Sequence, residues 1–269
     1  MAKPLIAMLT DFGSRDHYAG ALKGVILSLC PEVSLVDISH DIPPHDILTG
    51  ALELAACYRF FPAGTIFLAV VDPGVGSSRR GIAAEAGDYR FVAPDNGVLS
   101  AVFAETPPKR VVSLTERRYA RPTISKTFEG RDRFAPAAAW LARGAEVAAL
   151  GTAVRDFVRL EIPQARQEAD TIEGQVLRVD RFGNLVTNIP RAMVEHLAER
   201  GPIRITVGGV AVDSLVETYA GVASGAICAL FGGSDHLEIA ENGGRAADRL
   251  GLTVGAAASV SGSSGAARG

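Results

Sequence analysis

Cysteine is scarce in this sequence. Its 269 residues include three cysteines, Cys30, Cys57 and Cys228, which are widely spaced and each lie in an apolar segment. An odd, unclustered count argues against a disulfide framework and against a zinc site. We interpret the three cysteines as small buried hydrophobic residues and expect a cytoplasmic protein without a metal.

A basic excess and a long apolar run are also absent. Lysine and arginine number 27 against 30 aspartates and glutamates, and the net charge is −3, so no electrostatic footprint for nucleic acid is present. No apolar run reaches the roughly 18 residues needed to cross a bilayer, and the first residues carry no signal-peptide pattern. We expect a globular protein with neither nucleic acid nor membrane as a partner.

Several common catalytic motifs are missing. The chain has no Gly-Lys-Ser/Thr phosphate loop, no Gly-x-Ser-x-Gly elbow and no His-Glu-x-x-His helix. The stretch Gly74–Arg79 has two glycines, but an arginine stands where a dinucleotide-binding loop needs its third glycine. A dinucleotide site is therefore weakly supported.

The sequence does contain a short apolar strand that ends on a carboxylate. Thr65–Val71 is continuously apolar after its first residue, which is typical of a buried parallel strand. Asp72 follows, the segment Pro73–Gly76 breaks the strand, and Arg79 and Arg80 come next. Ligands of open α/β sheets gather beyond the carboxyl ends of strands. The pattern favours a functional loop, and the alternative is a turn with a surface ion pair.

Strands and helices alternate through the N-terminal half. This order predicts a parallel βαβαβ arrangement with right-handed crossovers, and Asp11 follows the first strand as Asp72 follows the third. A hairpin is predicted at Gly87-Asp88, and a further helix is expected to open at residues 93–97. The elements of the βαβαβ arrangement are the strands 5–9, 34–38 and 65–71 and the helices 17–30 and 47–60.

A polar, proline-rich turn offers an alternative metal site. It contains His40, Asp41, His45 and Asp46. Two prolines scatter these side chains, and the helical His-x-x-x-His spacing is absent. We expect Asp46 to be the N-cap of the next helix instead.

The C-terminal part has a different architecture, in which short apolar strands are separated by glycine and asparagine turns. We therefore expect an α/β protein with an N-terminal Rossmann-like domain and a smaller C-terminal β-barrel-like domain. The expected boundaries are 1–160 for the α/β domain, 161–170 for a linker, 171–260 for the barrel-like domain and 261–269 for a disordered tail.

Six segments together resemble one family, the S-adenosylmethionine (SAM) hydroxide adenosyltransferases, which are related to the fluorinases and chlorinases. They occur in family order over nearly the whole chain, which makes the resemblance specific. The segments are Leu9–Gly13, Val71–Gly76 with Arg79-Arg80, Ala93–Gly97, Thr127–Asp132, Asp180–Asn184, and Gly233-Ser234 with Leu237–Ala240 and Asn242.

The resemblance implies a SAM hydrolase that forms adenosine and methionine by attack of water at the ribose C5′ carbon. It assigns the handling of water to an Asp, an Arg and a His. The Asp falls on Asp72 and the Arg on Arg79, but the His falls on Glu129. The halogenating relatives carry Tyr at this place, so Glu129 matches neither group.

The resemblance also implies substrate contacts and an assembly. It places Asp11 at the ribose hydroxyls, Asp180 and Asn184 at the methionine portion, and Ser234 at the methionine carboxylate, and it places Glu238 and Asn242 beside the adenine-binding segment. A turn-forming role is the alternative for Asn184 and Glu238. SAM is substrate, no cofactor is implied, and a homotrimer with the site between subunits is implied.

Two other functions remain open at this point. One is a halide-using transferase, and the other is a non-catalytic binder of SAM or adenosine. The carboxylate of Glu129 should attract the sulfonium and repel a halide, which favours hydrolysis over halogenation. It would accept the proton of water well only if burial or Asp72 raised its pKa, because an ordinary glutamate is a weak base at neutral pH. Alternatively, Glu129 only pairs with Arg131 or Arg133 at the helix mouth.

Overall fold

The computed structural model describes residues 3–262 and divides into two compact units, Met1–Ile162 and Pro163–Gly269. The fold class expected from the sequence is confirmed, because an α/β unit precedes a smaller unit with a barrel-like sheet. The division lies inside the segment 161–170 that we expected to be a linker, and this segment carries a short strand, β8 (Arg166–Glu168). Among the described residues, no helix is long and apolar enough to cross a membrane.

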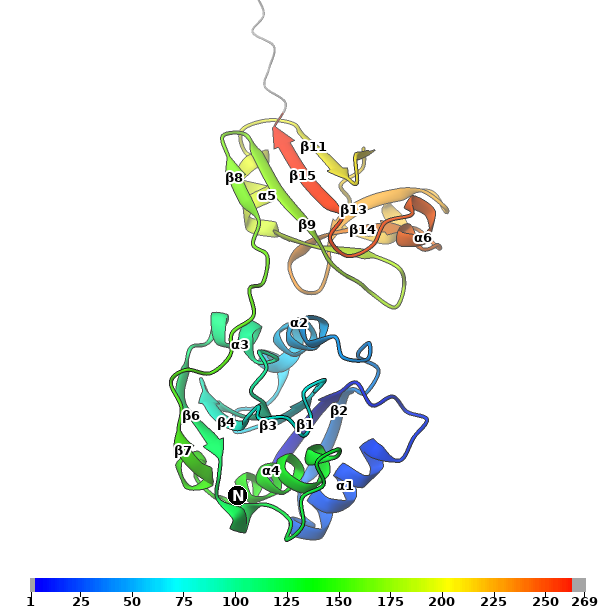
Figure 1. Cartoon of the computed structure of the whole chain (residues 1–269). Helices are drawn as coiled ribbons and strands as arrows, with labels where there is room; N and C mark the ends of the chain where they lie inside the picture. Colours follow the sequence, from blue (N-terminus) through cyan, green and yellow to red (C-terminus); the bar gives the residue numbers. More distant parts are fainter. Residues whose placement is uncertain (1–2, 263–269) are drawn as a thin grey trace, which may run out of the picture. The chain divides into compact units, whose positions relative to one another are not determined.

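Seven strands form one sheet in the first unit (Figure 1). Their spatial order is β2 (Ser34–Ser39), β1 (Leu5–Thr10), β3 (Ile66–Val70), β5 (Tyr89–Pro94), β4 (Gly81–Ala86), β6 (Pro108–Leu114) and β7 (Gly151–Ala153). The first three, β2, β1 and β3, are parallel neighbours as the sequence predicts, and β5 adds a fourth parallel strand that was not predicted. β4 and β6 each run antiparallel to both of their neighbours. β4 and β5 form the predicted hairpin at Gly87-Asp88.

Helices cover both faces of this sheet (Figure 1). The helices α1 (Tyr18–Leu29) and α4 (Ala135–Ala142) pack on one face, and α2 (Ile47–Cys57) and α3 (Ser100–Glu105) pack on the other. Alternate residues of β1 enter the two layers, Ile6 on the α1 side and Ala7 on the α2 side. Burial on both faces explains why the central strands are continuously apolar.

Local chemistry accounts for where two of these helices begin. Asp46 caps α2 as expected, since its carboxylate accepts the backbone N–H of Thr49 at 2.9 Å. The helix expected to open at residues 93–97 begins later, at Ser100, because Ala93 and Pro94 are still paired with β4. Shorter helical segments are η1 (Tyr58–Phe60), η2 (Arg117–Tyr119), the π-helical turn η3 (Gly130–Phe134), η4 (Val147–Leu150) and η5 (Tyr219–Gly221).

The second unit is an antiparallel sheet that nearly closes on itself. Its order is β12 (Val210–Val212), β11 (Ile203–Val207), β15 (Ala257–Gly262), β9 (Thr171–Val179), β10 (Leu185–Pro190), β14 (His236–Glu241) and β13 (Ile227–Phe231), with β8 beside β9. The two end strands of this order, β12 and β13, lie next to each other. The helices are α5 (Arg191–Ala198) and α6 (Ala246–Leu250).

The last strand corrects one expectation. Ser261 and Gly262, which we expected to begin a disordered tail, pair with β11 as the end of β15. Ala258 and Val260 of this strand are buried in the core of the unit, but their small neighbours gave only a weak strand pattern. The rest of the expected tail, 263–269, lies outside the described residues.

Candidate functional site

Asp72 lies just beyond the carboxyl end of β3, at the parallel part of the sheet. The loop after it is a pair of tight turns, in which Val75 donates to the carbonyl of Asp72 and Ser77 to the carbonyl of Gly74. Gly76 has φ +78°, and a Cβ at this position would overlap the carbonyl oxygen of Lys126. A glycine is therefore required both by the backbone angle and by the close approach.

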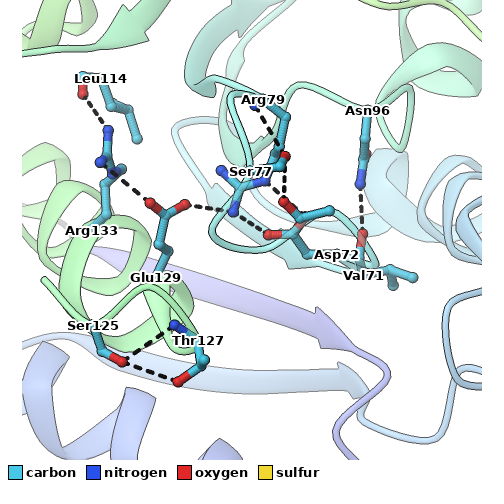
Figure 2. Close-up of polar contacts among 11 residues, drawn as sticks. Val71, Asp72, Ser77, Arg79, Asn96, Leu114, Ser125, Thr127, Glu129 and Arg133 are labelled. Atoms are coloured by element: carbon cyan, nitrogen blue, oxygen red, sulfur yellow. Dashed lines mark hydrogen bonds and ion pairs between the residues drawn. The ribbon is translucent and has the colours of Figure 1, made fainter.

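Arg79 returns from this loop to Asp72 (Figure 2). Its Nε donates to Oδ1 at 2.8 Å and its Nη2 donates to Oδ2, which is the bidentate fork that a guanidinium forms with a carboxylate. Both side chains are buried, with 10% of Arg79 and 5% of Asp72 exposed. The pair is thus a charged group inside the protein rather than a surface ion pair.

Glu129 approaches the same arginine from a distant part of the chain. Its Oε2 forms an ion pair with Nη2 of Arg79 at 2.5 Å, and its Oε1 lies 3.3 Å from Nη2 of Arg133 (Figure 2). Only 11% of the Glu129 side chain is exposed. Besides this charged contact with Arg79, no further hydrogen bond reaches Oε2 from the described residues. A buried carboxylate oxygen therefore retains its capacity to accept one.

The π-helical turn η3 begins directly after Glu129 and supports this cluster. Arg133 donates through Nη1 to the carbonyl of Leu114 at 3.2 Å, and the ring of Phe134 lies 5.2 Å from the guanidinium carbon of Arg79. A Cβ at Gly81 of β4 would overlap this ring. π-Helical turns are rare and often occur at functional sites.

The two carboxylates of this cluster are balanced by two cations, Arg79 and Arg133. Burial lowers the pKa of Arg79, but the hydrogen bonds and charge of Asp72 and the charge of Glu129 outweigh burial, so the pKa rises above its ordinary value. Arg79 is thus cationic at any physiological pH. It holds two carboxylates in one buried place, which is a suitable arrangement for binding and deprotonating water.

The other charges of η3 point to a different partner. Arg131 forms a bidentate pair with Asp132, at 2.7 and 2.8 Å, and Arg121 also contacts Asp132. Burial raises the pKa of Asp132, but the hydrogen bonds from Arg131 and Ser125 and the charge of Arg131 outweigh it and lower the pKa overall. Of the two arginines considered as partners of Glu129, the structure pairs Arg133 with it.

Asp11 lies on the same edge of the sheet as Asp72. Thr10 of β1 pairs in register with Val70 of β3, so the two carboxylates follow neighbouring parallel strands. Asp11 accepts the backbone N–H of His45 at 2.9 Å, and His45 has the unusual φ of 69°. Asp11 therefore fixes the turn that was considered as a metal site.

That turn has structural contacts of its own. His40 hydrogen-bonds to Thr10 at 2.8 Å and forms an ion pair with Asp37 at 3.1 Å, while Asp46 caps α2. Within residues 3–262, no group of three or more His, Cys, Asp or Glu side chains could hold a metal ion.

Three of the candidate residues in the second unit share one network. Asp180 accepts the backbone N–H of Asn184 at 2.8 Å and its side-chain amide at 2.9 Å. The hydroxyl of Tyr219 lies 3.5 Å from the Asn184 amide and donates to Oε1 of Glu238 at 2.8 Å. The network therefore joins the β9–β10 turn to strand β14.

Burial makes this network electrostatically unusual. It raises the pKa of Glu238, helped by the charge of Asp180 and only partly offset by Tyr219 and Arg178. It also raises the pKa of Tyr219 to about 12, with Glu238 adding to the shift. This cluster of oxygen atoms thus favours a ligand that supplies hydrogen-bond donors or positive charge.

Ser234 and Asn242 are not part of this network. They flank the two ends of β14, where the Ser234 carbonyl accepts from His236 at 2.8 Å and the Asn242 amide donates to Val222 at 2.8 Å. Tyr219 was missed by sequence reasoning, because it lies in an irregular loop without a motif. Its contact with Glu238 depends on the fold alone.

Comparisons with known proteins agree with this architecture. The family model described as the SAM hydroxide adenosyltransferase N-terminal domain matches residues 6–151, and the model of the C-terminal domain matches residues 174–259. The chain belongs to the SAM hydroxide adenosyltransferase family. The two matches fall on the two units of the structure, one on each.

Members of the SAM hydroxide adenosyltransferase family and their relatives align along nearly the full length. An (R)-S-adenosyl-L-methionine hydrolase of Salinispora tropica is 42% identical, covering 94% of this chain and 95% of the relative. A fluorinase of Nocardia brasiliensis is 29% identical, covering 96% and 97%. The structure of an uncharacterized conserved protein from Thermotoga maritima matches with a TM-score of 0.90 and 33% identity, over 95% of this chain and 99% of that one.

Proposed function

We propose that this protein hydrolyses SAM to adenosine and L-methionine. The observation that carries the proposal is the 42% identity, over 94% of the chain, to a protein named (R)-S-adenosyl-L-methionine hydrolase. That name specifies the R configuration at the sulfonium, and we extend it to the substrate of this chain. The buried Asp72–Arg79–Glu129 cluster supports the proposal, because it offers acceptors and a fixed cation for a water molecule.

The chemistry needs little from the protein at the leaving group. Water oxygen forms a bond to C5′ of the ribose, and the C5′–S bond breaks with its electron pair moving to sulfur. Methionine leaves as a neutral thioether, so no acid has to protonate it. A water proton must be lost, and free water with a pKa of about 15.7 is a poor nucleophile. Positioning and deprotonation of water are therefore the catalytic tasks.

We assign these tasks to three residues. Asp72 and Glu129 accept hydrogen bonds from the attacking water, and one of them takes its proton and later returns it to solvent. Arg79 holds both carboxylates in place and offsets their negative charge. No cofactor is part of this proposal, since the sulfonium is already an activated leaving group.

The remaining candidates are proposed to bind the substrate. Asp11 would hold the ribose hydroxyls, and Asp180 with Asn184 the methionine portion. Ser234 would bind the methionine carboxylate. Donors of the substrate suit the oxygen-rich network around Asp180. Glu238 and Asn242 are assigned to the neighbourhood of adenine.

Product analysis tests the reaction. The protein is incubated with the separated R and S epimers of SAM, with and without chloride, and the products are resolved by chromatography. Release of adenosine and methionine from the R epimer is expected. A halogenated nucleoside formed only with chloride would favour the transferase alternative, and binding without turnover would favour the non-catalytic alternative.

A cytoplasmic homotrimer is the second part of the proposal. Its support is that the candidate residues are divided between two units, and that the three cysteines are unpaired. We propose that one subunit supplies Asp72 and its neighbour supplies Asp180. An active monomer in light scattering at the assay concentration would contradict this.

Mixing of inactive variants tests the shared site directly. Asp72→Asn and Ser234→Ala proteins are unfolded, mixed and refolded together. If sites form between subunits, some mixed sites combine two intact units and activity returns. A mixture of Asp72→Asn and Glu129→Gln is the control, because both changes lie in the first unit and no intact site can form.

A further inference from the structure

Arg133 is a second cation beside the proposed catalytic carboxylates. Its Nη2 lies 3.3 Å from Oε1 of Glu129, and 30% of its side chain is exposed. The other end of its guanidinium is anchored, since Nη1 donates to the Leu114 carbonyl at 3.2 Å at the end of β6. Arg133 thus links Glu129 to the end of strand β6 in the sheet.

The charge of the cluster requires this second cation. Asp72 and Glu129 both contact Arg79, so without Arg133 two buried carboxylates would share one guanidinium. An uncompensated buried charge is costly, and it would favour protonation of one carboxylate. A protonated carboxyl could not accept a proton from water.

Arg133 also determines which oxygen of Glu129 is available. It contacts Oε1, while Oε2 lies 2.5 Å from Nη2 of Arg79 and is buried, with no other hydrogen bond from the described residues (Figure 2). This contact at Oε1 favours one orientation of the carboxylate. The oxygen with free acceptor capacity is therefore kept beside the bidentate Asp72–Arg79 pair.

We propose that Arg133 is the positioning residue for Glu129, holding its carboxylate in place with Oε2 aimed at the attacking water. This inference rests on the proposed hydrolysis. In the reaction, Oε2 accepts the proton that water loses as its oxygen bonds to C5′, and the carboxyl then releases that proton to solvent. Arg133 itself does not touch the substrate.

The test is a double-mutant cycle in the full-length protein. The variants are Arg133→Met, which removes the charge but keeps an aliphatic stem, Arg133→Lys, Glu129→Gln, and the double variant Glu129→Gln with Arg133→Met. Arg143→Met at the C-cap of α4 is the matched control, because Arg143 stacks on Trp140 instead. Each protein is assayed for adenosine release from (R)-SAM across pH.

Arg133→Met is expected to lower kcat at least about tenfold, which is part of the roughly 100-fold or more that a positioned proton acceptor contributes, with little change in KM. The acid limb of the pH–rate profile of this variant should move to higher pH, since removing the cation favours the protonated form of the Glu129 carboxyl group. Lysine should restore most of the activity. The double variant should be no slower than the slower single variant, because both changes remove one function.

Three results would overturn the inference: a kcat of Arg133→Met within about twofold of the control, an unchanged pH profile, or losses that multiply in the double variant. Absence of adenosine with the unaltered protein would instead contradict the proposed function. In that case, thermal unfolding of the same proteins tests whether Arg133 is coupled to Glu129. Additive changes in the unfolding midpoint of the variants would reject this coupling, and non-additive changes would support it.

Discussion

Arg79 binds Asp72 through two different nitrogens, with Nε on Oδ1 at 2.8 Å and Nη2 on Oδ2. Each oxygen of the carboxylate thereby uses one acceptor position and keeps another. The same Nη2 also faces Glu129 at 2.5 Å. Two carboxylates are thus oriented by one planar group, and their remaining acceptor positions suit a single water molecule.

The first prediction concerns the charge of Asp72. Asp72→Asn keeps the shape of the side chain but removes the charge that pairs with Arg79 and one acceptor for the attacking water, so adenosine release should fall at least about 100-fold. Chromatographic assay at saturating (R)-SAM measures it. Asp88→Asn, an exposed aspartate in the β4–β5 turn, is the control and should keep full activity. An unchanged rate in Asp72→Asn would remove Asp72 from the mechanism.

The second prediction concerns the nucleophile. A halide entering beside Asp72 and Glu129 would meet two carboxylates, and a unit charge at about 4 Å contributes roughly 4 kcal/mol at an effective dielectric near 20. Adenosine should remain the only nucleoside product when chloride is raised at constant ionic strength. The appearance of a 5′-chlorinated nucleoside in proportion to chloride would count against this reasoning.

The third prediction separates backbone strain from close contact. Gly76 and Gly144 both have positive φ, but only at Gly76 would a Cβ overlap another part of the backbone. Gly144→Ala should cost about 1 kcal/mol of stability from the backbone angle alone. Gly76→Ala should cost more and also reduce turnover, because the loop that carries Arg79 must move. Equal melting temperatures and equal rates for the two variants would contradict this explanation.

The fourth prediction concerns the pH dependence of stability. The pKa of Glu238 is raised above its ordinary 4.5 in the folded protein, so the folded state holds its proton to higher pH than the unfolded state does. Stability from this group is therefore present below 4.5 and is lost as pH rises through the folded pKa. Glu238→Gln should become more stable relative to the unaltered protein over this window.

Urea unfolding at several pH values measures the difference. Glu173→Gln is the matched control, since Glu173 is exposed on β9 in the same unit. Its stability relative to the unaltered protein should change little with pH. A Glu238→Gln curve that runs parallel to the unaltered curve would show that burial of Glu238 does not control its protonation.

The central sheet could be predicted because buried parallel strands leave a strong pattern. Thr65–Val71 is an apolar run that ends on Asp72, and pairing of Asp72 with Arg79 follows from the short loop between them. β15 and α6 could not be predicted in the same way. Their small residues carry little periodicity, and the core of the second unit, rather than local preference, holds them in place.

The remainder of the site depends on tertiary packing. Glu129 meets Arg79 only because η3 is wound as a π-helical turn against the sheet. Tyr219 meets Glu238 only because the fold brings η5 to β14. Neither contact leaves a spacing in the sequence, so the resemblance pointed to Glu129 and Glu238 but nothing pointed to Tyr219.

The placement of Arg79 and Arg133 depends on Gly81, a residue that has no functional side chain. A Cβ there would overlap the Phe134 ring, which faces Arg79, and would come within 3.2 Å of the Cδ of Arg133. The reaction would thus be sensitive to the exchange of one hydrogen atom for a methyl group at Gly81, the first residue of β4. A survey of inactive variants that considered only acids, bases and nucleophiles would overlook Gly81, although Phe134 and Arg133 lie directly against it.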